Sequence, residues 1–358
     1  ERQGFIRPHM ADENDKRTIY MVDMHEPLMF LHNLDTTIKE PFASNPAVLD
    51  AVEKNHKKLQ IAMTKLYPGN LVLSLSSGVM HHRLVDRITS LNDVPREPLV
   101  PRRLGKNMCV PFGKILRGKV VPNTVTKTLH TDKVYEPDLE SYTIEPFPYY
   151  SPLNSQIETI RSFDRPVILV DDLVHKADRL RVLVPKLRET GIPIKKVVVG
   201  VLSGYGRDLM QQLKVPVESI YSMPNVRQWF VESTLYPFIG GDTVRREEMK
   251  VAGLQPSINM ILPYATPKLS GCSREALVEF SACCIENSRD LLQVLEAEYR
   301  KQYAKNLTLS RLSEAVILPL CPDKGSCMEY DENLAASVYL ENDLEMLQRM
   351  RKFMVTIQ

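Results

Sequence analysis

Two adjacent acidic residues, Asp171 and Asp172, end a run of apolar residues that begins at Pro166. This run, PVILVDD at 166–172, is the strongest strand signal in the chain, and helical spacing begins soon after it. Two carboxylates at the end of a strand suit the hydroxyl groups of a ribose or a magnesium ion. In the alternative interpretation, one Asp caps the following helix and the other is solvated.

A second polar group, Ser76-Ser77-Gly78, lies at the end of LVLSLSS (71–77), which we expect to be a buried strand. Helical spacing over 79–91 follows directly. Hydroxyl groups, one glycine and the amides of a helix N-terminus together favour an anion. Because ligands of open α/β sheets collect at the carboxyl ends of the strands, both polar groups are candidate ligand contacts.

The elements that would position these residues alternate along the chain. We expect helices at 45–66, 153–163 and 206–214, and further strands at 107–112, 194–203 and 218–223. This alternation predicts an α/β fold with a mostly parallel sheet flanked by helices. Helical patterns from Ser273 to about 304, and from about 340 to 356, predict a mainly helical C-terminal region.

The acidic strand and the loop that leads into its helix resemble the ribose-phosphate motif of the type I phosphoribosyltransferases. The order of parts is similar too: a helix, a strand with a diphosphate-contacting loop (Ser76-Ser77-Gly78), a helix, a strand with a long hood, then the acidic strand. The hood is the segment of about 92–150, which is rich in Pro and in basic residues, among them Lys114, Arg117 and Lys119. The resemblance implies that a closing basic hood neutralises a diphosphate leaving group.

The resemblance also implies roles for the residues around the acidic pair. Asp171 and Asp172 would hold the ribose hydroxyls, bind Mg²⁺ and stabilise positive charge at the anomeric carbon. In this family a turn of the Thr-Thr-Gly type holds the 5′-phosphate, whereas this chain has His175, Lys176 and Ala177 at those positions. His175 and Lys176 would supply point charges, while the glycine that lets backbone amides surround a phosphate is absent.

The composition of the chain argues against several other classes of protein and of binding site. The chain has 358 residues and a formal net charge of +2, which does not indicate a nucleic-acid partner. Its 15 glycines, about 4% of the chain, count against phosphate loops built from many glycines. No run of 18 apolar residues indicates a membrane helix, and the start of the sequence shows no signal peptide. The six cysteines lack the paired spacing of a zinc site, so we expect reduced thiols in a cytoplasmic protein.

Three segments are expected: a tag or disordered N-terminus (1–16), a phosphoribosyltransferase-like α/β domain (17–250) and the helical C-terminal region (251–358). The stretches NMILPYATPKL and MEYDENLAASVYL also resemble the C-terminal part of bacterial cytidyltransferase-related multidomain proteins. That second resemblance implies that the chain is a fragment of a larger protein.

Three functions follow from these observations. The first is magnesium-assisted transfer of phosphoribose to a base or amine. The second is a non-catalytic, regulatory domain that binds a phosphorylated sugar or nucleotide. The third is an assembly module of a larger nucleotidyltransferase-related protein. The resemblance to the phosphoribosyltransferases, which often pair through their α/β domain, implies a homodimer.

Overall fold

The computed structural model describes residues 4–6, 20–101, 103–116, 119–148, 150–246, 251, 253–267, 269, 271–324 and 330–356. The chain divides into two compact units. Unit 1 comprises Glu1–Ser74, Tyr135–Ser141 and Arg227–Gln358, and unit 2 comprises Leu75–Val134 and Tyr142–Val226. The boundary expected near residue 250 lies inside unit 1, and most of the segment 1–16 lies outside the described residues. The expected division into domains therefore stays a prediction.

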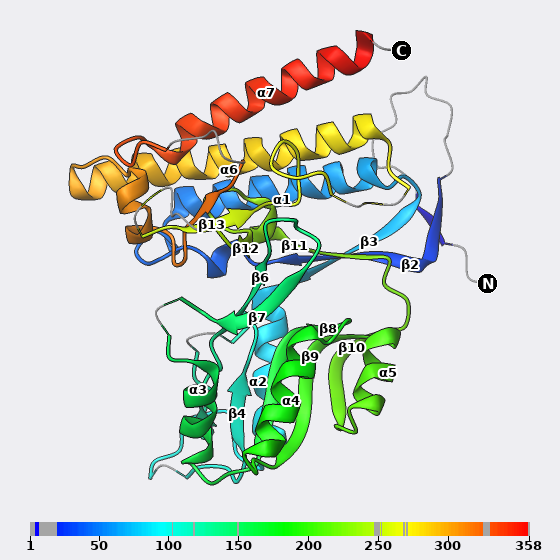
Figure 1. The fold of residues 1–358 in the computed structure, drawn as a ribbon, viewed down its shortest axis with the longest axis vertical. Helices are drawn as coiled ribbons and strands as arrows, with labels where there is room; N and C mark the ends of the chain where they lie inside the picture. The colour runs from blue at the N-terminus through cyan, green and yellow to red at the C-terminus, as the bar shows by residue number, and fades with distance from the viewer. Residues whose placement is uncertain are drawn as a thin grey trace. The chain divides into compact units, whose positions relative to one another are not determined.

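Unit 2 is built around a five-stranded sheet in which every pairing is parallel. In spatial order its strands are β10 (Val217–Met223), β9 (Ile194–Ser203), β8 (Val167–Val174), β4 (Met108–Pro111) and β5 (Val125–Thr126). The order of strands reverses between β4 and β8, as it does in doubly wound sheets (Figure 1). The predicted α/β fold with a mostly parallel sheet is confirmed.

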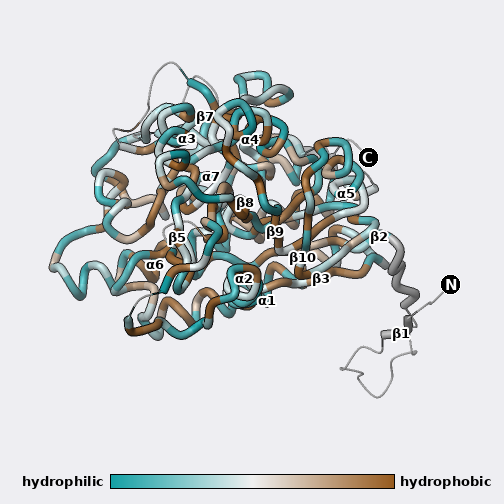
Figure 2. Tube along the Cα trace, turned by 90° about the horizontal axis from the view of Figure 1, so that it is seen from below, coloured by the Kyte–Doolittle hydropathy of each residue, from teal (hydrophilic) through white to brown (hydrophobic). Residues whose placement is uncertain are grey.

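The helices of unit 2 flank this sheet. They are α2 (Ser77–Leu91), α3 (Leu153–Arg161), α4 (Asp178–Glu189) and α5 (Gly204–Gln212). The strands β6 (Thr131–Tyr135) and β7 (Tyr142–Pro146) lie next to one another in the chain before α3. The first four residues of β8, Val167–Val170, are fully buried, and β8 and β9 are among the apolar parts of the chain trace in Figure 2. Burial on both faces explains why this strand has a continuous apolar run.

One predicted strand has a different environment from the one we expected. The segment 71–77 does form a strand, β3 (Asn70–Ser76), but none of its residues is fully buried. It pairs with β2 (Tyr20–His32), outside the five-stranded parallel sheet. The prediction of a buried strand is therefore wrong, because an edge strand can be apolar while only part of its surface is covered.

Unit 1 combines small sheets with long helices. Its strands are β1 (Gly4–Ile6), β2, β3, β11 (Gln228–Val231), β12 (Asp242–Val244), β13 (Gln255–Ile258) and β14 (Leu320–Pro322). Its helices are α1 (Pro46–Leu66), α6 (Arg274–Tyr303) and α7 (Ala336–Thr356), with 3₁₀ turns η1 (Leu34–Thr36), η2 (Glu232–Leu235) and η3 (Leu309–Glu314). Helix α6 lies between α1 and α7 (Figure 1). The predicted helical C-terminal region is therefore confirmed.

Local signals explain where the long helices begin. The side chain of Asn45 accepts hydrogen bonds from the amides of Ala47 and Val48 at the start of α1. The hydroxyl of Ser273 accepts from the amide of Ala276 at the start of α6. Both are N-cap interactions of the kind that stabilise a helix by about 1 kcal/mol.

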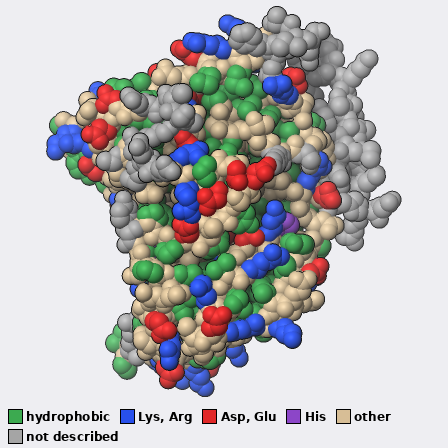
Figure 3. Space-filling model, in the orientation of Figure 1, with side chains coloured by type: hydrophobic (Ala, Val, Ile, Leu, Met, Phe, Trp, Pro, Cys, Tyr) green, Lys and Arg blue, Asp and Glu red, His purple; other side chains and the backbone are tan. Residues whose placement is uncertain are grey.

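The surface of the face drawn in Figure 3 carries Lys and Arg intermixed with Asp and Glu, in line with the balanced composition. In the part of the chain that the structure describes, no helix is both long enough and apolar enough to cross a bilayer.

Candidate functional site

Asp171 lies where β8 passes the end of β4, at the point where the order of strands reverses. Pro111, the last residue of β4, pairs with Val170 of β8. Two residues after Pro111 comes Gly113, where a Cβ atom would lie only 1.6 Å from Oδ1 of Asp171. Glycine is therefore required at position 113, because any side chain there would overlap the carboxyl group.

The carboxyl group of Asp171 faces protein groups on both of its oxygens. The side chain is 5% exposed, and Oδ1 accepts a hydrogen bond of 2.8 Å from the amide of Asp172. Oδ2 lies 3.8 Å from Nη1 of Arg179. Burial, followed by the charge of Asp172, raises the pKa of Asp171 well above its usual value, although Arg179 acts in the opposite direction.

Asp172 is half-buried at the same edge of the sheet, and β9 brings a helix close to it. A Cβ atom at Gly200 would lie 2.1 Å from Sδ of Met80 and 2.7 Å from the backbone oxygen of Asp172. The absence of a side chain at Gly200 therefore lets the first turn of α2 approach this edge. The predicted contacts Ser76-Ser77-Gly78 lie at the start of that helix, with Ser77 buried and the other two residues exposed.

His175 comes just after β8 and is held from β9. Its Nδ1 lies 2.8 Å from Oγ of Ser203, the last residue of β9. Since that hydroxyl oxygen already accepts a hydrogen bond from the amide of Gly206, its own hydrogen can point to Nδ1. The ring of Tyr205 lies beside His175, with 5.6 Å between the ring centroids. Burial, more than the charge of Lys176, lowers the pKa of His175, which favours a neutral imidazole.

Ala177 has the backbone conformation that glycine favours. Its φ of 53° and ψ of 29° lie in the left-handed region, directly before α4 begins at Asp178. Ala177 as a whole residue is 9% exposed. The glycine is thus absent at this position, but the turn of the backbone that it would allow is present.

The basic residues of the predicted hood have different positions. Lys114 and Lys119 are exposed, as is Lys176 after β8, while Arg117 lies outside the described residues. Burial, and next the charge of Lys119, lowers the pKa of His81 in the first turns of α2. The charge of Lys119 in the hood therefore acts on the start of α2.

Sequence reasoning missed several residues of this arrangement. Arg179 is one of them: its Nε is buried, with no hydrogen-bond partner among the residues that the structure describes. Ser203 is another, although a signal for it existed, because Ser203-Gly204 comes at the end of a strand just as Ser77-Gly78 follows β3. Gly113 carried no signal, since its role depends on a residue 58 positions away in the sequence.

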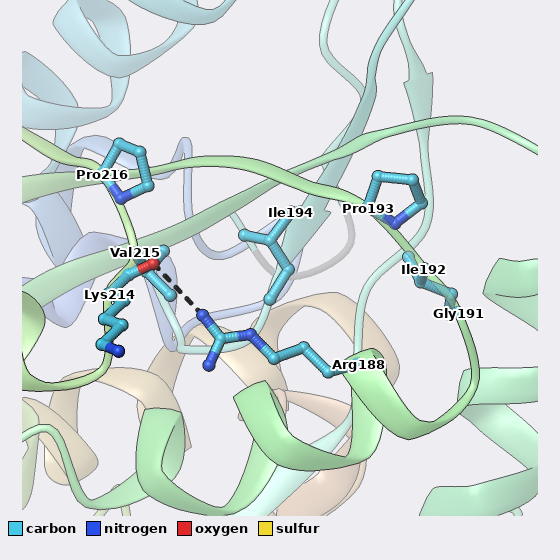
Figure 4. A pocket seen from close by; sticks show the side chains of 8 residues that line it. All are labelled: Arg188, Gly191, Ile192, Pro193, Ile194, Lys214, Val215 and Pro216. Carbon is cyan, nitrogen blue, oxygen red and sulfur yellow. Dashed lines mark hydrogen bonds between the residues drawn. The ribbon is translucent and has the colours of Figure 1, made fainter.

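A cavity in unit 2 lies away from Asp171, Asp172 and His175. It has a volume of about 290 Å³, lies where β9 and β10 begin and is lined by 188, 191–194 and 214–216 (Figure 4). Nη2 of Arg188 there donates to the backbone oxygens of Leu213 and Lys214, over 2.8 and 3.2 Å. The guanidinium group of Arg188 thus ties α4 to the segment between α5 and β10. The carboxyl end of the sheet remains the better candidate site.

Comparisons with known proteins add little to this geometry. No protein-family model matches the chain, and no curated protein matches it. Among solved structures, 29 chains match. One is a purine phosphoribosyltransferase from Pyrococcus horikoshii, at 12% identity and a TM-score of 0.28, covering 43% of this chain and 87% of that one.

Another is a hypoxanthine phosphoribosyltransferase from Trypanosoma cruzi bound to the product IMP. It is 16% identical, with a TM-score of 0.25, and the match covers 42% of this chain and 73% of that one. Scores this low carry no weight for function. The resemblance to cytidyltransferase-related proteins also stays a prediction.

Proposed function

We propose that unit 2 binds a phosphorylated ribose or a nucleotide, together with magnesium, at the carboxyl end of its sheet between β4 and β8. The observation that carries this proposal is the position of Asp172 in β8 and of His175 directly after it, at the place where the order of strands reverses. Loops after the two central strands diverge there, which is where open α/β sheets bind ligands. The neighbouring exposed lysines would attract the phosphate groups.

Asp172 is the acid that would contact the ligand. It is half-buried, whereas both oxygens of Asp171 are engaged with Asp172 and Arg179. Magnesium commonly takes one or two carboxylates and completes its shell with water and substrate phosphates. The residues present fit such an ion if Asp172 is the protein ligand and Asp171 fixes the backbone beneath it.

The phosphate contacts would come from three short segments. His175 and Lys176 lie after β8, the start of α2 supplies Ser77 and the amide of Gly78, and the segment after β4 supplies Lys114. Ser203 would orient the ring of His175 so that Nε2–H is free to donate to a phosphate oxygen. This orientation requires no positive charge on the imidazole.

Transfer of phosphoribose to a base or amine is the second candidate. The left-handed conformation of Ala177 favours it, because this is the backbone conformation that the expected glycine would allow before α4. The burial of Asp171 favours binding without turnover, as in a regulatory or assembly domain, since only Asp172 is accessible to stabilise charge at the anomeric carbon.

Calorimetry with phosphoribosyl diphosphate and Mg²⁺ tests the proposal. We expect binding that weakens at least tenfold in Asp172→Asn, while Asp164→Asn, the same change near the opposite end of β8, leaves the affinity unchanged. No heat of binding at millimolar ligand would refute the proposal, and so would equal affinities for the two variants. Release of diphosphate with an added base or amine would establish transfer.

A further inference from the structure

A second group of ligand-type side chains lies in unit 1, apart from the residues discussed so far. His32 ends β2, and Glu232 follows β11 directly. The two strands pair in parallel with Leu31 opposite Val231, so the residues that come next on each strand are neighbours. His56 reaches the same point from α1.

The three side chains converge on one oxygen atom. Oε2 of Glu232 lies 2.7 Å from Nε2 of His56 and 3.2 Å from Nδ1 of His32. One ligand atom from each residue lies within 4.8 Å of the other two. In a tetrahedral zinc site with bonds of ~2.0 Å, ligand atoms lie roughly 3.3 Å apart. The separation between His32 and Glu232 already matches this value, the one between His56 and Glu232 would have to grow by about 0.6 Å, and rotation of the side chains would adjust the remaining one.

The protein surroundings hold this group in place. Asn33 and Ser233, the next residue on each strand, exchange two hydrogen bonds of 2.9 Å, from Asn33 Nδ2 to Ser233 Oγ and from the Ser233 amide to Asn33 Oδ1. These bonds are buried and fix the two strand ends in register. The hydroxyl of Tyr236 donates to Oε1 of Glu232 over 3.3 Å, which leaves Oε2 to the histidines.

Hydrogen bonds within the chain do not give every polar atom of the cluster of His32, His56 and Glu232 a partner. The side chain of Glu232 is fully buried; Tyr236 and His32 are hydrogen-bond partners of its oxygens, and a cation would in addition balance the charge of a buried carboxylate. Nε2 of His56 is buried too, and despite its short distance to Glu232 it makes no hydrogen bond of acceptable angle within the described residues. A cation between the ring nitrogens and Oε2 would satisfy both groups.

Gln60 provides the outer contact that a metal-bound histidine needs. Its Nε2 lies 3.2 Å from Nε2 of His32 and 3.1 Å from Oγ of Ser74. A turn of the amide by 180° would present its oxygen to Nε2–H of His32 and leave Nδ1 free to bind an ion. Such contacts fix the tautomer of metal-ligating histidines.

We propose that His32, His56 and Glu232 bind a divalent transition-metal ion of the zinc type, with at least one coordination position left to water. Two imidazole nitrogens and one carboxylate oxygen suit zinc better than magnesium or calcium, which prefer oxygen ligands. The side chain of His56 is 26% exposed, against 12% for His32, so the open position faces the side of His56.

Zinc titration of the metal-stripped full chain tests this site. We expect one Zn²⁺ per chain and a visible d–d absorption when Co²⁺ replaces it. His56→Ala should weaken Zn²⁺ binding at least tenfold and abolish the cobalt spectrum, whereas His82→Ala, which removes an exposed histidine of unit 2, should bind Zn²⁺ as the original chain does. Asp172→Asn should have no effect, which separates this site from the proposed function.

A variant of Gln60, the outer contact of His32, provides a second test if His56→Ala does not fold. Gln60→Ala should keep the stoichiometry and weaken Zn²⁺ binding by about 10-fold, the size of effect typical of such contacts. The proposal is overturned if the original chain binds no stoichiometric Zn²⁺. It is also overturned if His56→Ala folds and keeps its affinity, or if Gln60→Ala binds as tightly as the original chain.

Discussion

The strain at Ala177 can be measured by replacing this residue with glycine. A non-glycine residue in the left-handed region costs roughly 1–2 kcal/mol, which Ala177→Gly would relieve. Two losses oppose this gain: burial of one methyl group, worth about 0.8 kcal/mol, and about 0.4–1 kcal/mol of extra entropy in the unfolded chain. The terms nearly cancel, so we expect a free energy of unfolding close to that of the original chain.

Lys214 in the same unit is the matched control. It also has a positive φ, 51°, but its side chain is exposed, so Lys214→Gly loses no buried methyl group. We expect Lys214→Gly to raise the free energy of unfolding by about 0.8 kcal/mol, measured by urea denaturation with a probe for unit 2. The reasoning fails if Ala177→Gly destabilises by more than about 1 kcal/mol, because the backbone there would then not be strained.

Two further predictions concern the buried carboxyl group. Gly113→Ala should lower the free energy of unfolding by about 1–3 kcal/mol in urea denaturation, because its Cβ atom would overlap Oδ1 of Asp171; an unchanged stability would contradict the close approach. Asp171→Asn should become more stable relative to the original chain as the pH rises from about 4. The raised pKa of Asp171 means that stability present below the unfolded pKa of ~3.9 is lost as the pH rises through the folded pKa. A difference in unfolding free energy that does not change with pH would refute that assignment.

The parts of the fold that could be predicted from the sequence are those with local signals. The run before Asp171 combines β-branched residues with full burial, and Ser273 marks the start of α6 as an N-cap. The pairing of β2 with β11 had no such signal, because Leu31 and Val231 are far apart in the sequence. For the same reason the sequence predicts β3 as a strand but not its pairing with β2.

The candidate site of unit 2 was predictable only where its residues are consecutive. Asp171, Asp172 and His175 belong to one stretch of sequence, in β8 and directly after it, so a local pattern names them together. The contacts that determine what these residues can do come from elsewhere: Gly113 covers one carboxyl group, and Ser203 orients the imidazole. Burial by distant residues therefore decides which acid is accessible, and no local pattern reports it.

Both candidate sites lie where two adjacent parallel strands end. His32 ends β2 and Glu232 follows β11, two adjacent parallel strands in unit 1; likewise Ser203 ends β9 and His175 follows β8 in unit 2. Where parallel strands end together, side chains leave the hydrogen-bonded ladder side by side, and a helix or loop covers them. The sequence shows such a site only when one strand supplies several polar residues. A site that takes one residue from each strand, such as the group around Glu232, becomes visible only when the strand partners are known.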